Sequence, residues 1–146
     1  MTSKSSEAQI RTVIDSHAKA LRAKDAKAVL SHYAPGVVMF DLAPPLMHAG
    51  SEADGLKALE SWFATWQGPL GYETRDFSIT TEGDLAFGYG FVRIHGTKVS
   101  GERNDLWARQ TLGLRRIAGA WKITHEHTSV PFYMDGTYKA AIDLKP

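Results

Sequence analysis

The sequence predicts an α+β fold, with helices in the first half and antiparallel strands in the second. Apolar residues recur at helical spacing in the first half, whereas later runs alternate and are joined by short Gly-containing turns. Helices followed by a series of strands typically cover one face of a curved sheet. The 146 residues are enough for one core, so we expect a single domain over residues 1–146.

Two helices are expected first. The first should begin at Ser5 or Ser6 and carry a stripe made of Ile10, Val13, Ile14, His17 and Leu21. Asp25 is expected to cap the second helix, which should bury Tyr33 and end at Pro35-Gly36.

A short strand over Val37–Asp41 and a Pro-containing loop should follow. Ser51 and Asp54 suit the start of a third helix, which would end at Gly68-Pro69. Its apolar side would present Leu56, Leu59, Trp62, Phe63 and Trp66.

Four longer strands are predicted in the second half. Their expected ranges are Tyr72–Thr81, Leu85–Thr97, Arg103–Ala118 and Ala120–Ser129. The segments Glu82-Gly83-Asp84 and Ala118-Gly119-Ala120 are typical of hairpin turns.

Alternation within the strands predicts their faces. Along Arg103–Ala118, the odd positions (Asp105, Trp107, Arg109, Thr111, Gly113) would line a pocket, leaving the apolar even positions on the outside of the sheet. A second chain would cover that outer face, so we expect a homodimer. In the last strand, Trp121, Ile123, His125 and His127 would share one side and form a pocket wall.

Composition excludes several classes of function. The formal net charge is +1 and no basic run exceeds Arg115-Arg116, which argues against nucleic-acid binding. The chain has no cysteine, hence no disulfide, thiolate nucleophile or Cys-ligated zinc. No apolar run suits a membrane span or a signal peptide, so we expect a cytoplasmic protein.

The order of these elements resembles the NTF2-like superfamily, in particular its SnoaL-like and ketosteroid-isomerase-like branch. The resemblance covers roughly Ile10 to Pro131, and the ending Trp121-Lys122-Ile123-x-His125-x-His127-x-Ser129-x-Pro131 is similar to a subgroup of uncharacterised isomerase-like proteins. It implies a cone-shaped, strongly bent sheet around helices, a deep cavity open at one end, and frequent dimers.

Comparison with ketosteroid isomerases is informative residue by residue. Their general-base Asp lies eight residues after the Tyr that ends the second helix, which corresponds here to Asp41. The position of their oxyanion-binding Tyr holds His17, and that of their protonated Asp holds Gly113. The base is thus retained, one donor is changed and the other is missing, which argues against steroid isomerisation by that mechanism.

Asp41 and His17 each have two interpretations. Asp41 ends an apolar strand, where it would be either a general base with a desolvated carboxylate or an acceptor of loop N–H bonds. His17 on the helical stripe would be either a hydrogen-bonded core residue or a proton donor.

His125 and His127 have three interpretations. They would form structural hydrogen bonds with neighbouring hydroxyls such as that of Thr111, line a polar pocket where they bind or protonate a ligand, or bind a metal ion. No carboxylate third ligand is evident, so no metal and no cofactor are expected. Arg109 would pair with Asp41, Asp105 or an anionic substrate group, or would be solvated if the strand face is reversed.

The aromatic residues favour a small apolar or aromatic ligand, held by Phe40, Trp62, Trp66, Tyr89, Trp107 and Thr111. We therefore expect acid–base chemistry of the isomerase, cyclase or dehydratase type on an apolar carbonyl compound. Asp41 would abstract the proton, and His17 or the histidine pair would donate one. The alternatives are a non-catalytic ligand-binding module and a histidine-based metal site.

Overall fold

The computed structural model describes residues 2–49 and 52–146, within which three helices and five strands form an α+β fold. The elements in chain order are α1 (Ser3–Arg22), α2 (Ala26–Leu30), β1 (Tyr33–Phe40), α3 (Glu52–Ala64), β2 (Trp66–Glu82), β3 (Leu85–Lys98), β4 (Arg103–Ile117) and β5 (Ala120–Ser129). Within the described ranges, each helix is too short or too polar to cross a lipid bilayer.

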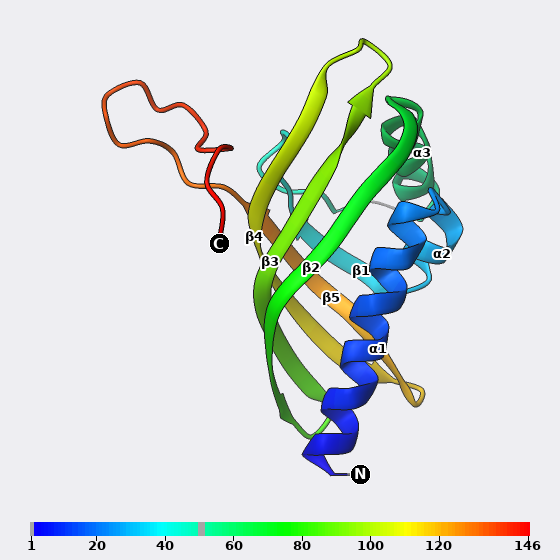
Figure 1. Cartoon of the computed structure of the whole chain (residues 1–146). Coiled ribbons are helices and arrows are strands. Elements are labelled where there is room, and N and C mark those ends of the chain that lie inside the picture. Colours follow the sequence, from blue (N-terminus) through cyan, green and yellow to red (C-terminus); the bar gives the residue numbers. More distant parts are fainter. Residues whose placement is uncertain (1, 50–51) are drawn as a thin grey trace.

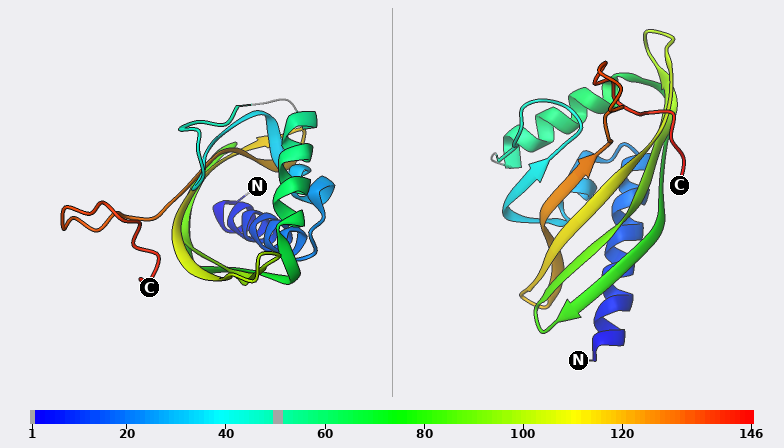
Figure 2. Two further views of the ribbon diagram at one scale, coloured as in Figure 1. Left: turned by 90° about the horizontal axis from the view of Figure 1, so that it is seen from above. Right: turned by 90° about the vertical axis from the view of Figure 1, so that its left-hand side faces the viewer.

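The five strands form one curled sheet in the order β1-β5-β4-β3-β2. The strand β1 runs parallel to β5, and the other neighbouring pairs are antiparallel. Figure 1 shows α1 lying along the sheet, and the view from above in Figure 2 shows the sheet curving around that helix. The predicted mostly antiparallel, strongly curved sheet is confirmed.

The apolar stripe predicted on α1 is confirmed, and Ile10 within it is completely buried. The helix begins at Ser3, earlier than the predicted Ser5 or Ser6. The reason is a cap one turn upstream, where the Thr2 hydroxyl oxygen accepts the N–H of Ser5 at 3.2 Å.

Asp25 caps α2 as predicted, because its carboxylate accepts the N–H of Ala28 at 3.1 Å. The prediction that this helix continues to Pro35 is wrong. Tyr33 is already in β1 and pairs with Ile123 of β5, so the ladder with a strand 90 residues away in sequence overrides the local helical pattern.

The helix α3 ends at Ala64, before the predicted end at Gly68-Pro69. Trp66 opens β2 instead and pairs with Lys98 of β3. The predicted start at Ser51 lies outside the described residues. Both predicted hairpin turns are confirmed, and Gly83 and Gly119 adopt φ angles of +58° and +82° in them.

The prediction of the β4 faces is wrong. Ala108, Gln110 and Leu112, on the even positions, are buried inside the curl, whereas Arg109 and Thr111 are exposed on the outside. The sheet curls around α1, so the apolar even face packs inward and forms the core instead of facing a second chain.

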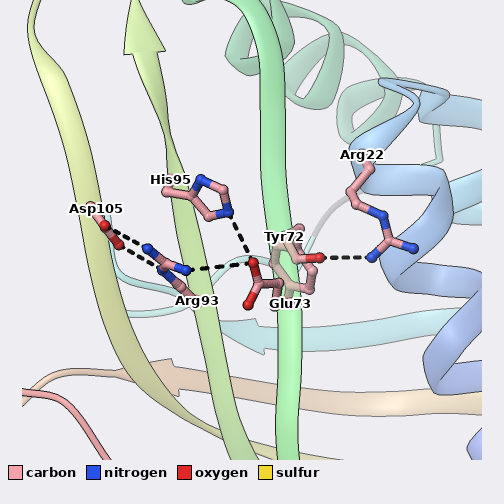
Figure 3. Close-up of polar contacts among 6 residues, drawn as sticks. All are labelled: Arg22, Tyr72, Glu73, Arg93, His95 and Asp105. Carbon is pink, nitrogen blue, oxygen red and sulfur yellow. Dashed lines mark hydrogen bonds and ion pairs between the residues drawn. The ribbon is translucent and has the colours of Figure 1, made fainter.

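Adjacent residues of β2 show the same alternation. The Tyr72 side chain is buried, and its carbonyl oxygen accepts a 2.7 Å hydrogen bond from Arg22 of α1. The next residue, Glu73, faces outward and lies within 3.6 Å of Arg93, whose guanidinium also binds Asp105 (Figure 3). This exposed network contributes little to stability.

The strand β5 changes face in its middle. Ile123 is buried, but the next buried side chains are those of Glu126 and Thr128, so the spacing is three residues where regular alternation requires two. A register shift against β4 follows Ile123 and inserts one extra residue. The prediction that His125 and His127 share the face of Ile123 is therefore wrong.

After β5, residues 130–146 form an arm that projects away from the sheet (Figures 1 and 2). The arm is closed by hydrogen bonds from Tyr133 N to Lys139 O and from Ala141 N to Pro131 O, each 2.8 Å. Large apolar side chains remain exposed along it: Phe132, Met134, Tyr138, Ile142 and Leu144.

Candidate functional site

A polar cluster lies inside the curl, where the surrounding side chains are apolar. Its members, called the Glu126 cluster below, are His17 (α1), Tyr33 (β1), Tyr72 (β2), Gln110 (β4), Glu126 and Thr128 (β5). A buried polar network of this kind stabilises a fold only when its members are hydrogen-bonded, so the contacts decide its chemistry.

Glu126 is a nearly buried carboxyl group, 7% exposed. Its two carboxyl oxygens lie 3.2 and 3.1 Å from the Tyr33 hydroxyl. Burial and, to a smaller extent, the negative charge of Asp41 raise the pKa of Glu126 to about 7, while the hydrogen bond from Tyr33 acts in the opposite direction. Glu126 therefore exchanges a proton near neutral pH.

His17 contacts the other side of the Tyr33 hydroxyl. Its Nε2 lies 2.8 Å from the Tyr33 oxygen, and the imidazole is 5% exposed. Burial lowers the pKa of His17 to about 3, with a smaller contribution from His32. The ring is consequently neutral at physiological pH. Burial and the charge of Glu126 raise the pKa of Tyr33 well above its usual range, so its hydroxyl keeps its proton.

Gln110 joins the remaining members. Its Nε2 lies 3.2 Å from the Tyr72 hydroxyl, 3.2 Å from the Thr128 hydroxyl and 3.4 Å from a Glu126 oxygen. Two amide hydrogens thus face three acceptors. The amide supplies a donor to Glu126 without adding a charge that would hold the carboxyl ionised.

Asp41 lies next to the cluster but is exposed to solvent. It follows β1 directly, and the alternation of that strand places it on the face of Met39, which pairs with Glu126 in the β1–β5 ladder. Its Oδ1 accepts the N–H of Leu42 at 2.7 Å, which corresponds to the second interpretation stated for this residue. Its charge contributes to raising the pKa of both Glu126 and Tyr72. Glu126 is thus linked to His17 through the Tyr33 hydroxyl and to Asp41 through electrostatics.

The two histidines of β5 lie on the other side of the sheet. His125 contacts the Val38 carbonyl oxygen through Nδ1 at 2.6 Å, and His127 is exposed. The ring of Phe40 lies edge-on to both imidazoles, at centroid distances of 4.8 and 5.5 Å. Thr111 pairs with His127 across the strands, but both side chains are exposed.

Arg109 also lies outside the curl, where its guanidinium donates a 3.3 Å hydrogen bond to the Ser129 hydroxyl. It is exposed, which corresponds to the solvated alternative in the sequence-based interpretation. The outer face also carries Trp107, which stacks with Arg75 at 5.6 Å from its ring centroid, and Tyr89, which is 54% exposed.

Trp62 and Trp66 lie at the end of the core near α3. Trp66 is buried and Trp62 is half-buried, with their ring centroids 5.8 Å apart and nearly perpendicular. The ammonium of Lys98 lies over the Trp66 ring, 3.8 Å from its centroid. Within the described residues these rings pack against the core cluster that contains Tyr72.

Sequence-based reasoning missed Glu126, Tyr33, Gln110, Tyr72 and Thr128. One signal was present for Gln110, a single amide within the apolar even positions of β4. Glu126 gave no signal, because strict alternation assigns it to the face opposite Ile123. Only the extra residue in β5 turns it inward.

Neither of two surface hollows shares a lining residue with the Glu126 cluster. The first, of about 210 Å³, lies between α1 and β2 and is lined by Arg11, Ile14, Asp15, Thr74, Arg75, Asp76 and Phe77. The second lies around residues 23–27. In residues 2–49 and 52–146, no three His, Asp or Glu side chains gather closely enough to hold a metal ion.

The comparisons with known proteins agree with this architecture. The SnoaL-like domain model matches residues 10–133. The chain is 31% identical to an NTF2-like protein of unknown function from Pseudomonas putida KT2440, with a TM-score of 0.88 over 100% of both chains. No curated protein matches the chain.

Two further solved structures share the fold at lower identity. A ketosteroid isomerase-like protein from Erwinia carotovora atroseptica SCRI1043 is 22% identical, with a TM-score of 0.70 over 84% of this chain and 93% of the other. A scytalone dehydratase-like protein from Novosphingobium aromaticivorans DSM 12444 is 14% identical, with a TM-score of 0.73 over 85% and 83%. With the family match across the curled sheet and its helices, these likenesses confirm the resemblance: the chain belongs to the SnoaL-like domain family and has the NTF2-like fold.

Proposed function

We propose that this protein is an acid–base enzyme of the isomerase, cyclase or dehydratase type that acts on an apolar, carbonyl-containing small molecule. The observation that carries the proposal is Glu126, a buried carboxyl whose pKa is raised to about 7 beside the exposed Asp41. Two carboxyl groups in different environments provide an acid and a base at one pH.

Asp41 acts as the general base, since its exposed carboxyl group follows β1 on the face of Met39, the ladder partner of Glu126. Glu126 acts as the acid in its protonated form, held by the Tyr33 hydroxyl and the Gln110 amide. The proposal gives no step to His125, His127 or Arg109, because they face away from Glu126.

The pH dependence follows from these roles. Protonated Glu126 is lost as the pH rises through about 7, so activity should decline above that pH.

A non-catalytic ligand-binding module is the second candidate function, favoured by the low 7% exposure of Glu126 and by its hydrogen bond to Tyr33 inside the protein. Binding by such a module would lack the two limbs of a pH–rate profile.

Proton exchange tests the proposal before the natural substrate is known. A panel of apolar ketones bearing acidic α-hydrogens is incubated with the protein in D₂O, and loss of the α-proton signal is followed by NMR. We expect exchange with the wild type, at least a ~100-fold slower rate in Asp41→Asn, and slower exchange in Glu126→Gln.

The exposed Glu82 at the end of β2 provides the matched control, because Glu82→Gln removes a carboxylate far along the sheet from the cluster. Its exchange rate should equal that of the wild type. Unchanged exchange in Asp41→Asn would show that Asp41 is not the base, and absence of exchange across a broad panel would favour the binding module.

We also propose that two copies associate through the outer face of the sheet. The even positions of β4 form the core and are not available to a second chain. The support now comes from apolar side chains on the odd positions of β3, where Leu85, Phe87 and Tyr89 are each about half-exposed. The cytoplasmic location stays a prediction.

A further inference from the structure

Three elements contribute to a continuous buried chain of hydrogen-bonding groups. It runs from Glu126 on β5 through the hydroxyl of Tyr33 on β1 to Nε2 of His17 on α1. The distances are 3.1 Å and 2.8 Å at the shorter contacts. Glu126 and His17 are 7% and 5% exposed, so most of this path is buried.

Proton counting gives this chain one arrangement when Glu126 is ionised and allows a second when Glu126 is protonated. The Tyr33 hydroxyl has one proton to donate and can accept another. When Glu126 is ionised, Tyr33 must donate to it, so His17 must carry its proton on Nε2 and donate to the Tyr33 oxygen. When Glu126 is protonated it can donate to Tyr33, whose own proton then points at an unprotonated Nε2 of His17.

We propose that Tyr33 couples the protonation state of Glu126 to the tautomer of His17, so that the state of the carboxyl decides which ring nitrogen of the buried, neutral imidazole carries the proton. His17 and Tyr33 are then positioning residues, since neither needs to touch a substrate. The coupling requires only the hydrogen-bonded chain and goes beyond the proposed function.

The change between the two arrangements balances with water as the only co-reactant. When Glu126 gains a proton along this path, the Tyr33 proton moves to the carboxylate, the Nε2 proton of His17 moves to the Tyr33 oxygen, and Nδ1 of His17 takes up one proton, so the imidazole remains neutral. Ionisation of Glu126 reverses these moves. The half-buried ring of His32 lies edge-on to that of His17 at a centroid distance of 6.1 Å.

The other groups around the path do not replace its protons. Asp41, Tyr33 and Tyr72 are the titratable groups acting on Glu126, and Gln110 faces it with a neutral amide. His17 faces His32, Tyr33 and Tyr72. The ammonium of Lys122 acts on His32 and helps to lower its pKa.

Nitrogen-15 NMR of the full-length protein labelled at histidine tests the coupling, because the two ring nitrogens report the tautomer directly. In the wild type we expect neutral His17 to change from the Nδ1–H form to the Nε2–H form as the pH rises through about 7, where Glu126 ionises. In Glu126→Gln and in Tyr33→Phe this transition should be lost.

Tyr138→Phe, which removes a hydroxyl from the exposed arm, is the matched control and should keep the transition. If Tyr33→Phe fails to fold, Glu126→Gln alone decides the test. A His17 tautomer that is constant with pH in the wild type, or a transition that persists in a folded Tyr33→Phe or in Glu126→Gln, overturns the proposal. Either result can occur with normal α-proton exchange, so failure of the coupling and failure of the proposed enzymatic function are distinguishable.

Discussion

At the scale of single residues, Glu126 and His17 carry opposite pH dependences of stability. The pKa of Glu126 is raised from 4.5 to about 7 on folding, so folding favours its protonated form and stability falls as the pH rises through that window. The pKa of His17 is lowered from 6.5 to about 3, so stability is lost as the pH falls through that range. Between 4.5 and 6.5 the two effects oppose each other.

Replacing Glu126 by Gln should remove the loss of stability that accompanies ionisation of Glu126 as the pH rises. Raising a carboxyl pKa from 4.5 to about 7 corresponds to about 3 kcal/mol of stability at high pH. The free energy of unfolding of Glu126→Gln, relative to the wild type, should therefore increase by up to about 3 kcal/mol between about pH 4.5 and about pH 8. Urea unfolding at the two pH values measures this difference.

The control for this prediction is again Glu82→Gln. An exposed carboxylate should change the free energy of unfolding by less than about 0.5 kcal/mol at either pH. An equal effect of Glu126→Gln at both pH values would mean that Glu126 does not titrate in this window in the folded protein.

At the scale of elements, the extra residue in β5 decides which side chains form the site. It lets the first part of the strand contribute Ile123 to the core and the second part contribute Glu126, whereas His125 turns outward. The β2–β3 pair has a second irregularity, a register shift between Arg75 and Ser78.

Close packing at that second irregularity predicts a large effect of one methyl group. A Cβ added to Gly90 of β3 would lie 2.6 Å from the Phe77 ring and 2.9 Å from the Arg75 carbonyl oxygen. Since a backbone atom cannot move aside easily, Gly90→Ala should reduce the free energy of unfolding by about 1–3 kcal/mol. Chemical denaturation of the purified variant gives the value.

Gly113 of β4 is the matched position for this test. An added Cβ there would meet its nearest neighbour, the Thr124 hydroxyl oxygen, at 3.5 Å, which is ordinary van der Waals contact. Gly113→Ala should therefore be neutral or slightly stabilising. A similar decrease in the free energy of unfolding of both variants would mean that the contact distance does not determine whether this sheet tolerates an added methyl group.

At the scale of the whole molecule, the curl separates an inner face devoted to α1 and the Glu126 cluster from an outer face open to solvent (Figure 2). That outer face holds aromatic side chains and two histidines, and the apolar arm projects beside it. A second copy related by a two-fold axis would cover both the face and the arm with the same surfaces of each chain.

Light scattering at micromolar concentration should therefore give the mass of two chains. The double variant Phe87→Glu/Tyr89→Glu places like charges on the outer face of β3 and should give the mass of one chain. Lys27→Glu, on the exposed side of α2, should remain a dimer. A wild-type protein with the mass of one chain would refute the association.

The sequence by itself determined the class of the fold, the order of its elements and its family. Helical spacing placed α1, the two Gly-containing turns fixed the β2–β3 and β4–β5 hairpins, and Asp25 marked the start of α2. These features depend on neighbours within a few residues, which the sequence displays directly. The roles of Asp41 and His17, which came from the family resemblance, stay predictions.

Only the tertiary structure decided which strand faces point inward and which residues form the cluster. Tyr33 lies in β1 and not in the predicted helix because it pairs with β5. The side chain of Glu126 points inward because one extra residue shifts the register of β5 against β4. Both outcomes depend on pairing between segments distant in the sequence, where a shift of one residue exchanges every side chain between the two faces. That exchange moved the two histidines outside and placed the carboxyl between them at the centre of the candidate site.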